Sequence, residues 1–200
     1  MARTLNGRVL SEVVWTDGAI WTKRVALVAL GIAAMAIAAK VKVPFWPVPI
    51  TMQSFVVLSV GAAYGMRLGA VTLLGYLAIG ALGFDIFTSS SASNNGLAYM
   101  MAGTGGYLVG FLLAVLALGA LARIGWDRSP LKMAGAMLIG EVLIFLPGVL
   151  WLGHLYAADK GWAWVMEWGL TAFLPAEALK LALAAVLFPL AWRAVGRARG

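Results

Sequence analysis

An acid and a base lie three residues apart in an otherwise apolar segment close to the C-terminus. Glu177 and Lys180 belong to the stretch FLPAEALKLALAAVLFPL. In a helix this spacing places both side chains on one face, and a charge at membrane depth costs roughly 2.5–3.5 kcal/mol. We therefore expect the pair to form the floor of a ligand site. An ion pair that joins two helices is the alternative use of the same residues.

Two further segments carry candidate binding residues. Glu141, in MLIGEVLIFLPG, either contacts a ligand or is a packing carboxyl that burial keeps neutral. The segment AGTGGY supplies Thr104, Gly105 and Tyr107 just before an apolar run. Backbone amides at a helix N-terminus attract an anion such as a carboxylate, so we expect this segment to contribute to the site. A tight turn that lets the loop pack on the helices is the alternative.

Aromatic and amide side chains in two other loops complete the candidate set. The proline-rich segment VPFWPVPITMQSF carries Trp46 and Gln53, and the serine-rich loop carries Tyr99. Prolines fix the backbone, so an aromatic beside them can form a wall for an apolar ring. Trp46 would equally serve as an anchor at the membrane interface, where tryptophan is enriched.

The composition indicates a membrane protein. The 200 residues are 62% hydrophobic and 12% charged, whereas soluble domains carry about 25% charge. The apolar runs are long and do not alternate, which favours helices over barrel strands. Cysteine is absent and His154 is the only histidine, so thiolate chemistry, cysteine metal sites and multi-histidine metal sites are excluded. No cofactor is expected.

Six apolar segments predict an all-α integral membrane protein with six transmembrane helices. They cover about residues 25–39, 51–64, 67–84, 105–121, 131–152 and 169–192, the fifth with a break at Pro147 and Gly148. Residues 1–22 lack the features of a signal peptide and are expected to form an amphipathic arm or a poorly ordered tail. Residues 23–193 form the membrane domain, and residues 194–200 form a basic tail.

The distribution of basic residues predicts the orientation. With both termini in the cytoplasm, eleven lysines and arginines lie inside and three lie outside, as the preference for positive inner loops requires. The net charge of +7 therefore reflects the topology in the membrane, and no nucleic-acid partner is expected. The long connections, residues 40–50, 85–104 and 153–168, lie outside, which favours a site that opens to the exterior.

Small residues in the first segment predict close contact with another helix. Ala29 and Ala33 are four residues apart, as are Ala34 and Ala38, and such spacing lets helix backbones approach. We expect Ala34 and Ala38 to lie on the exposed side and to dock a partner. Packing within the bundle is the alternative.

Four motifs resemble the BioY family, the biotin-specific S components of energy-coupling-factor (ECF) vitamin transporters. They are PVPITMQSF, RLGAVTLLGYLAIGALGFDIF, GTGGYLVGF and FLPAEALKLALAA. The family often has Pro-Gly-Asp where this chain has Pro175, Ala176 and Glu177, so the exact contacts of this acid differ. The resemblance implies an S-component bundle in the cell membrane, a biotin pocket near the outer surface, and partners comprising a coupling protein and two ATPase subunits. It also implies that the stretch from Ala29 to Ala38 contacts the coupling protein.

The residues found first suit biotin. Glu177 can accept from the ureido N–H groups, and Lys180 can donate to the ureido oxygen or pair with the carboxylate. A different vitamin would suit the same fold. An intramembrane enzyme lacks a nucleophile and base, and a structural membrane protein would not need the buried charges.

Overall fold

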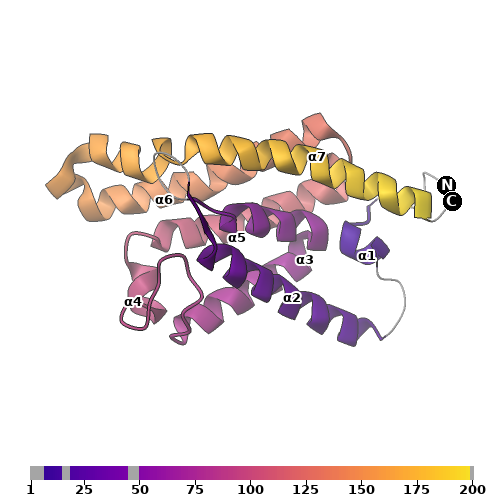
Figure 1. The fold of residues 1–200 in the computed structure, drawn as a ribbon, viewed down its shortest axis with the longest axis horizontal. Coiled ribbons are helices and arrows are strands. Elements are labelled where there is room, and N and C mark those ends of the chain that lie inside the picture. Colours follow the sequence, from indigo (N-terminus) through magenta and orange to yellow (C-terminus); the bar gives the residue numbers. More distant parts are fainter. Residues whose placement is uncertain (1–6, 15–18, 45–49, 199–200) are drawn as a thin grey trace.

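The computed structural model describes residues 7–14, 19–44 and 50–198 (Figure 1). In chain order the elements are α1 (Leu10–Val14), α2 (Ile20–Lys40), β1 (Lys42–Val43), β2 (Ile50–Thr51), α3 (Gln53–Ala81), α4 (Gly96–Met101), α5 (Gly105–Arg123), η2 (Trp126–Arg128), α6 (Pro130–Met166), the π-helical η3 (Glu167–Thr171) and α7 (Leu174–Ala198). β1 and β2 pair antiparallel, with Val43 opposite Ile50. The chain is therefore almost entirely helical, as its composition predicts.

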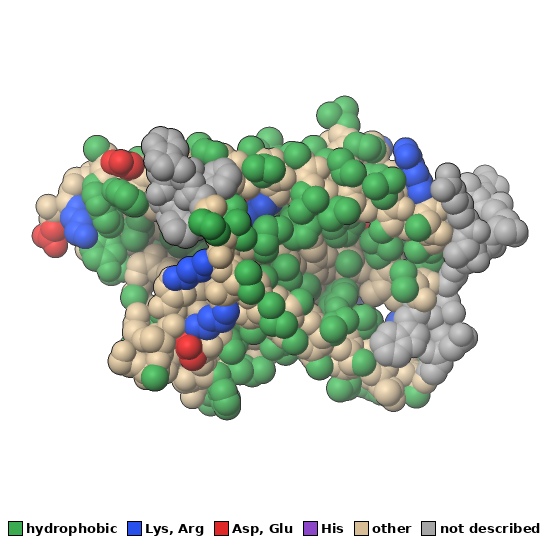
Figure 2. All heavy atoms as spheres, in the orientation of Figure 1, with side chains coloured by type: hydrophobic (Ala, Val, Ile, Leu, Met, Phe, Trp, Pro, Cys, Tyr) green, Lys and Arg blue, Asp and Glu red, His purple; other side chains and the backbone are tan. Residues whose placement is uncertain are grey.

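Four helical stretches among the described residues are long and apolar enough to cross a membrane. They are Ile20–Lys40, Gln53–Ala81, Gly105–Arg123 and Pro130–Gly196. Large apolar side chains are exposed along them, and apolar side chains are spread over the visible face in Figure 2. A surface of this kind needs a lipid or protein environment.

The α3 helix doubles back at Gly65. Gly65 has φ 76° and ψ 173°, a conformation open to glycine. A Cβ placed on Gly69 would lie 3.5 Å from the Cα of Gly61, whereas eight residues of straight helix span about 12 Å. The two arms of α3 thus pack against each other, and the chain breaks between the second and third segments that the sequence predicts.

The α6 helix turns in the same way, but at Gly161. There φ is 79°, Trp162 packs back against Gly153, and the rings of Tyr156 and Trp164 lie 6.0 Å apart. The expectation of a break at Pro147 and Gly148 is wrong, because α6 runs through both residues. The expected outer connection over residues 153–168 is itself mostly helical, since the turn occurs at a single glycine.

The core lies between α3, α5 and α6, with α5 packed against both of the others. Fully buried side chains include Leu73, Val115 and Met137. A Cβ on Gly110 would come within 2.6 Å of the Cα of Ile144, so only glycine permits this approach of α5 to α6. Close backbone contact of this kind compensates in lipid for the absent hydrophobic effect between helices.

The N-terminal arm packs on the same end of the bundle as the end of α7 (Figure 1). Val9 and Val13 are fully buried. Arg123 donates to the carbonyl of Gly7 and forms an ion pair with Glu12 at 2.9 Å. The described part of the arm is therefore attached to the helices through both apolar and ionic contacts.

The opposite end carries the loop between α3 and α4. Lys40, at the end of α2, forms an ion pair with Asp85, and Ser90 donates to the same carboxylate. The hydrogen bond from Lys40, followed by that from Ser90, lowers the pKa of Asp85 below its ordinary value. These contacts hold the loop over the ends of α2 and α3.

Candidate binding site

A cavity of about 510 Å³ opens between α3, α5, α6 and α7. Its lining combines a polar floor with an aromatic wall. The lining residues are Ile50, Thr51, Gln53, Ser54, Phe87, Thr88, Tyr99, Gly103, Thr104, Tyr107, Leu108, Phe111, Ile144, Phe145, Leu152, Tyr156, Lys160, Trp164, Trp168, Phe173, Glu177 and Lys180. Volume and lining are typical of small-molecule sites, which occupy about 300–1,000 Å³ and are mostly apolar with a few polar groups.

The floor is a closed hydrogen-bond triangle of Glu177, Lys180 and Ser54. Lys180 Nζ donates to Glu177 Oε1 and to Ser54 Oγ, both at 2.8 Å. Ser54 Oγ donates in turn to Glu177 Oε2 at 2.9 Å. The side chains of Lys180 and Glu177 are 5% and 9% exposed. The burial cost of each charge is therefore offset by its neighbour and by hydrogen bonds.

Lys180 retains one N–H donor for a ligand in the cavity. An ammonium group has three N–H donors, and the described residues accept two of them. Both side chains line the cavity. The floor thus offers a ligand a donor and, through the carboxylate of Glu177, an acceptor.

Glu141 of α6 lies at the same height in the bundle as Glu177 of the floor. The rings of Phe145 and Phe173 meet with centroids 6.2 Å apart, which fixes the register of α6 against α7. One helical turn further toward the end of the bundle that carries α1 come Glu141, on α6, and Glu177, on α7. Glu141 is 7% exposed, and neither of its oxygens has a hydrogen-bond partner within the described part of the chain.

Aromatic rings form the wall above this floor. Tyr107 contacts Phe145 edge to face, with centroids 5.9 Å apart. Its hydroxyl donates to the carbonyl of Gly169 at 2.7 Å, which fixes the ring between α5 and η3. Phe173, the residue before α7, continues the wall. The arrangement suits a flat apolar ring, because aromatic faces and edges pack well on such groups.

The loop between α3 and α5 closes the remaining side through a chain of hydrogen bonds. Gln53 Nε2 donates to Tyr76 Oη at 2.9 Å, and Thr88 Oγ1 donates to Gln53 Oε1. Tyr99 donates to the carbonyl of Thr88, and its ring stacks on Phe87 at 5.1 Å. Burial raises the pKa of Tyr99 above its ordinary value, so the hydroxyl stays a donor. These residues are therefore held firmly at the cavity edge.

Comparison with known proteins now decides the family. The family model described as the BioY family matches residues 7–197. The chain belongs to the BioY family.

Relatives of this BioY protein cover most of its length. A probable biotin transporter BioY of Pyrococcus horikoshii is 32% identical over 165 residues, which is 82% of this chain and 93% of the relative. The biotin transporter BioY2 of Lactococcus lactis subsp. cremoris is 32% identical over 163 residues, 80% of this chain and 85% of the relative.

A solved structure shares the fold. The crystal structure of the S-component for biotin from an ECF-type ABC transporter matches with a TM-score of 0.69 at 20% identity, and the match covers 90% of this chain and 95% of that one. The chain therefore has an ECF S-component fold, and with its apolar helices it is a membrane protein.

Most of the predicted binding residues of this BioY protein do line one cavity. Glu177, Lys180, Gln53, Tyr99, Thr104 and Tyr107 all face it. Trp46 lies outside the described residues. Gly105 is not among the lining residues, since the side on which a Cβ would sit is 2.9 Å from the indole nitrogen of Trp151. Gly105 therefore serves packing between α5 and α6.

The expected anion site at the start of α5 is not formed by the predicted amides. The Gly105 amide donates to the carbonyl of Ala102, and the Tyr107 amide donates to the carbonyl of Thr104. The hydroxyl of Thr104 donates to the carbonyl of Tyr99 at 3.2 Å. These two amides and this hydroxyl are satisfied within the turn, so the packing alternative describes these groups better.

Several lining residues were not among the predicted ones. Ser54 follows Gln53 directly and bridges the floor, and Phe145 lies one turn from Glu141. Trp164 and Trp168 look like interfacial tryptophans in the sequence, but they line the cavity. The turn at Gly161 folds the end of α6 back along the part of α6 that precedes it, which brings both tryptophans to the cavity. A single glycine in the sequence does not predict such a reversal.

The alanines of α2 divide between two environments. Ala29 and Ala33 are exposed and Ala34 is half-buried. The expectation that Ala38 lies on the exposed side is wrong. It is 7% exposed, because it lies on the face of α2 that carries Gly31, which packs on Thr72 of α3.

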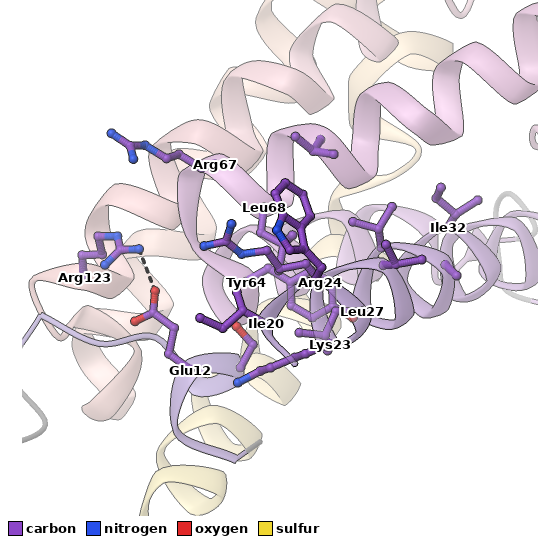
Figure 3. Close-up of a pocket in the computed structure, with 16 residues that line it drawn as sticks. Glu12, Ile20, Lys23, Arg24, Leu27, Ile32, Tyr64, Arg67, Leu68 and Arg123 are labelled. Atoms are coloured by element: carbon purple, nitrogen blue, oxygen red, sulfur yellow. Dashed lines mark hydrogen bonds and ion pairs between the residues drawn. The ribbon is translucent and has the colours of Figure 1, made fainter. Parts of the chain in front are cut away.

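A second cavity, of about 820 Å³, lies between α1, α2 and α3 (Figure 3). Ala29 lines it together with Arg24, Arg67 and Tyr64. Its charged groups are not buried, since the ion pair of Glu12 with Arg123 has side chains 41% and 43% exposed. The cavity with the buried ion pair is therefore the candidate ligand site.

Proposed function

We propose that this chain binds biotin in the 510 Å³ cavity and acts as the substrate-specific S component of an ECF transporter. The observation that carries the proposal is the buried pair of Glu177 and Lys180 at the floor of an aromatic cavity in a chain of the BioY family. The named relatives are biotin transporters. A buried donor and acceptor on one face suit the ureido group, which has N–H donors and a carbonyl acceptor.

The cavity suggests how each part of biotin is held. The ureido ring lies on the floor, where Glu177 accepts from N–H and the free donor of Lys180 meets the carbonyl oxygen. The apolar thioether ring packs between Tyr107, Phe145 and Phe173. The carboxylate tail extends toward Gln53 and the loop of Tyr99. Specificity follows because a ligand without the ureido pattern leaves the buried charges unsatisfied.

Equilibrium binding of radiolabelled biotin to purified protein tests this function. We expect saturable binding that excess biotin abolishes and that unrelated vitamins such as riboflavin and thiamine leave unchanged. Saturable binding of another labelled vitamin, with no binding of labelled biotin, would reassign the substrate. No binding of any vitamin would remove the transport function.

Six membrane crossings with both termini in the cytoplasm fit the described helices. The turns at Gly65 and Gly161 divide two of the four long apolar stretches into pairs of arms. α1 and the end of α7 lie together, beside the basic residues Arg123 and Arg128. The cavity then opens toward the exterior, from which biotin enters.

Cysteine labelling tests this topology, because the chain contains no cysteine of its own. Ser91 and Arg193 are both exposed and lie toward opposite ends. In intact cells a membrane-impermeant thiol reagent should modify Ser91→Cys and spare Arg193→Cys. Modification of Arg193→Cys alone would reverse the orientation.

A membrane-embedded coupling protein and two ATPase subunits are the proposed partners. The exposed part of the alanine stretch, Ala29 and Ala33, is the proposed docking surface on α2. Ala33→Trp should leave biotin binding intact and reduce co-purification with the coupling protein, since a large side chain prevents close helix approach. Ala38→Trp is the contrast, because its buried position predicts loss of folding. Normal complex formation by Ala33→Trp would remove the docking proposal.

A further inference from the structure

A second buried acid, Glu141, lies beside the floor, although it is not among the residues that line the cavity. Glu141 is 7% exposed, and Glu177 and Lys180 are 8% and 5% exposed. The ammonium group of Lys180 is engaged by Glu177 and Ser54. Both oxygens of Glu141 are buried without a hydrogen-bond partner among the described residues. An ionised carboxylate in that position would lose its hydration with nothing to replace it, at a cost of several kcal/mol.

Among the described residues that line the cavity, the one cation besides Lys180 is Lys160, which lies over the rings of Tyr156 and Trp164, roughly 28 Å along α6 from Glu141. Next to Glu141 on α6, Gly140 contacts the uncharged Leu58 of α3 and Leu118 of α5. α7 presents Glu177 and Lys180, and α5 presents Tyr107, whose hydroxyl is bonded to a carbonyl. Two carboxylates therefore share one lysine, and repulsion between like charges opposes ionisation of both.

We propose that Glu141 holds an exchangeable proton beside the floor of the cavity and that biotin binding is linked to this proton. The inference rests on the proposed biotin function. With Glu141 neutral, the third N–H of Lys180 remains available for the ligand. Loss of the proton to water creates a second carboxylate, which draws Lys180 away from the ligand. Biotin affinity therefore falls as rising pH removes the proton.

Infrared spectroscopy tests the proton without any use of biotin. The neutral carboxyl gives a carbonyl stretch distinct from that of a carboxylate. We expect this band in the wild-type protein at neutral pH, with a shift in deuterated water. Glu141→Gln should remove it, and Asp127→Asn, which alters a buried acid outside the cavity, should retain it. Absence of the band in the wild type, or its persistence in Glu141→Gln, would overturn the assignment of the proton.

Biotin affinity as a function of pH tests the linkage. Wild-type affinity should fall with rising pH by up to tenfold per unit, the limit for one proton. Glu141→Gln, which is neutral at every pH, should bind biotin with a flat profile. An equal pH dependence in both proteins would overturn the linkage. If Glu141→Gln does not fold, a biotin-induced change in the carboxyl band of the wild type supports the linkage, and an unchanged band contradicts it.

A failure of the biotin function and a failure of the role proposed for Glu141 give different results. A wild-type protein that shows the carboxyl band but binds no biotin at any pH refutes the biotin function while the proton stays assigned. A wild-type protein that binds biotin without the band or the pH dependence refutes only the role of Glu141.

Discussion

Buried acids occur at both ends of this molecule, and they differ in what surrounds them. At the end of the bundle that carries α1, Asp127 of η2 accepts from the indole of Trp192 at 2.6 Å, and the guanidinium of Arg128 lies over the same ring at 4.4 Å. Toward the other end, Glu177 is also buried but faces a cavity. The first acid joins helices and the second is accessible to a ligand. Burial of a charge therefore does not identify a site unless space adjoins it.

The largest expected effect comes from breaking the floor. Glu177→Ala removes the carboxylate that pairs with Lys180 and leaves the buried ammonium group less compensated, which should lower stability by about 3–5 kcal/mol and abolish biotin binding. The double variant Glu177→Leu with Lys180→Leu should recover most of the thermal midpoint in detergent, since no charge remains buried, but should not bind. A Glu177→Ala protein with the thermal midpoint of the wild type would show that the pair of Glu177 and Lys180 is not desolvated.

The end of the bundle that carries α1 and η2 should respond in stability alone. Trp192→Phe removes the donor to Asp127 and leaves a buried acceptor unsatisfied, at a cost of about 1–3 kcal/mol. Biotin affinity of the folded fraction should not change. A tenfold loss of affinity with normal folding would mean that the two ends are coupled, and the comparison would fail.

The pH dependence of stability sharpens the same contrast. Burial raises the pKa of Asp127 to about 6, although the indole of Trp192 and the charge of Arg128 act in the opposite direction. Because the folded-state pKa lies above the ordinary value of 3.8, this group favours folding most below that value, and its contribution declines as pH rises through about 6. In Asp127→Asn this contribution to stability does not decline with pH. The thermal midpoint of Asp127→Asn, taken relative to that of the wild type, should therefore rise between acidic and neutral pH. A difference that stays constant with pH would contradict the raised pKa of Asp127.

The smallest effect is expected from the exposed ion pair of Lys40 and Asp85, whose side chains are 35% and 46% exposed. Lys40→Gln should change the thermal midpoint slightly, because solvent screens exposed pairs. Biotin affinity should stay within experimental error. A large loss of affinity would indicate that the loop after α3 must be fixed by Lys40 for the site to form.

The sequence predicts the helical class, the break near Gly65 and the deep pair well, because each follows from long apolar runs or from a charge within one. It does not predict that Trp164 and Trp168 line the cavity, since their position depends on the single turn at Gly161 and on the π-helical turn of η3. It also misassigns Gly105, because glycine at a helix start suits an anion site and close packing equally. Only the position of Trp151 distinguishes these two uses.

The central claim is that the buried floor of the cavity, and not a charge elsewhere, holds biotin. Calorimetric titration with biotin of Lys180→Met, compared with wild type and with Lys40→Gln, tests it most directly. Lys180→Met should lose at least tenfold in affinity, about 1.4 kcal/mol, and should keep a cooperative thermal transition, while Lys40→Gln binds like the wild type. Wild-type affinity in a folded Lys180→Met protein would contradict the account.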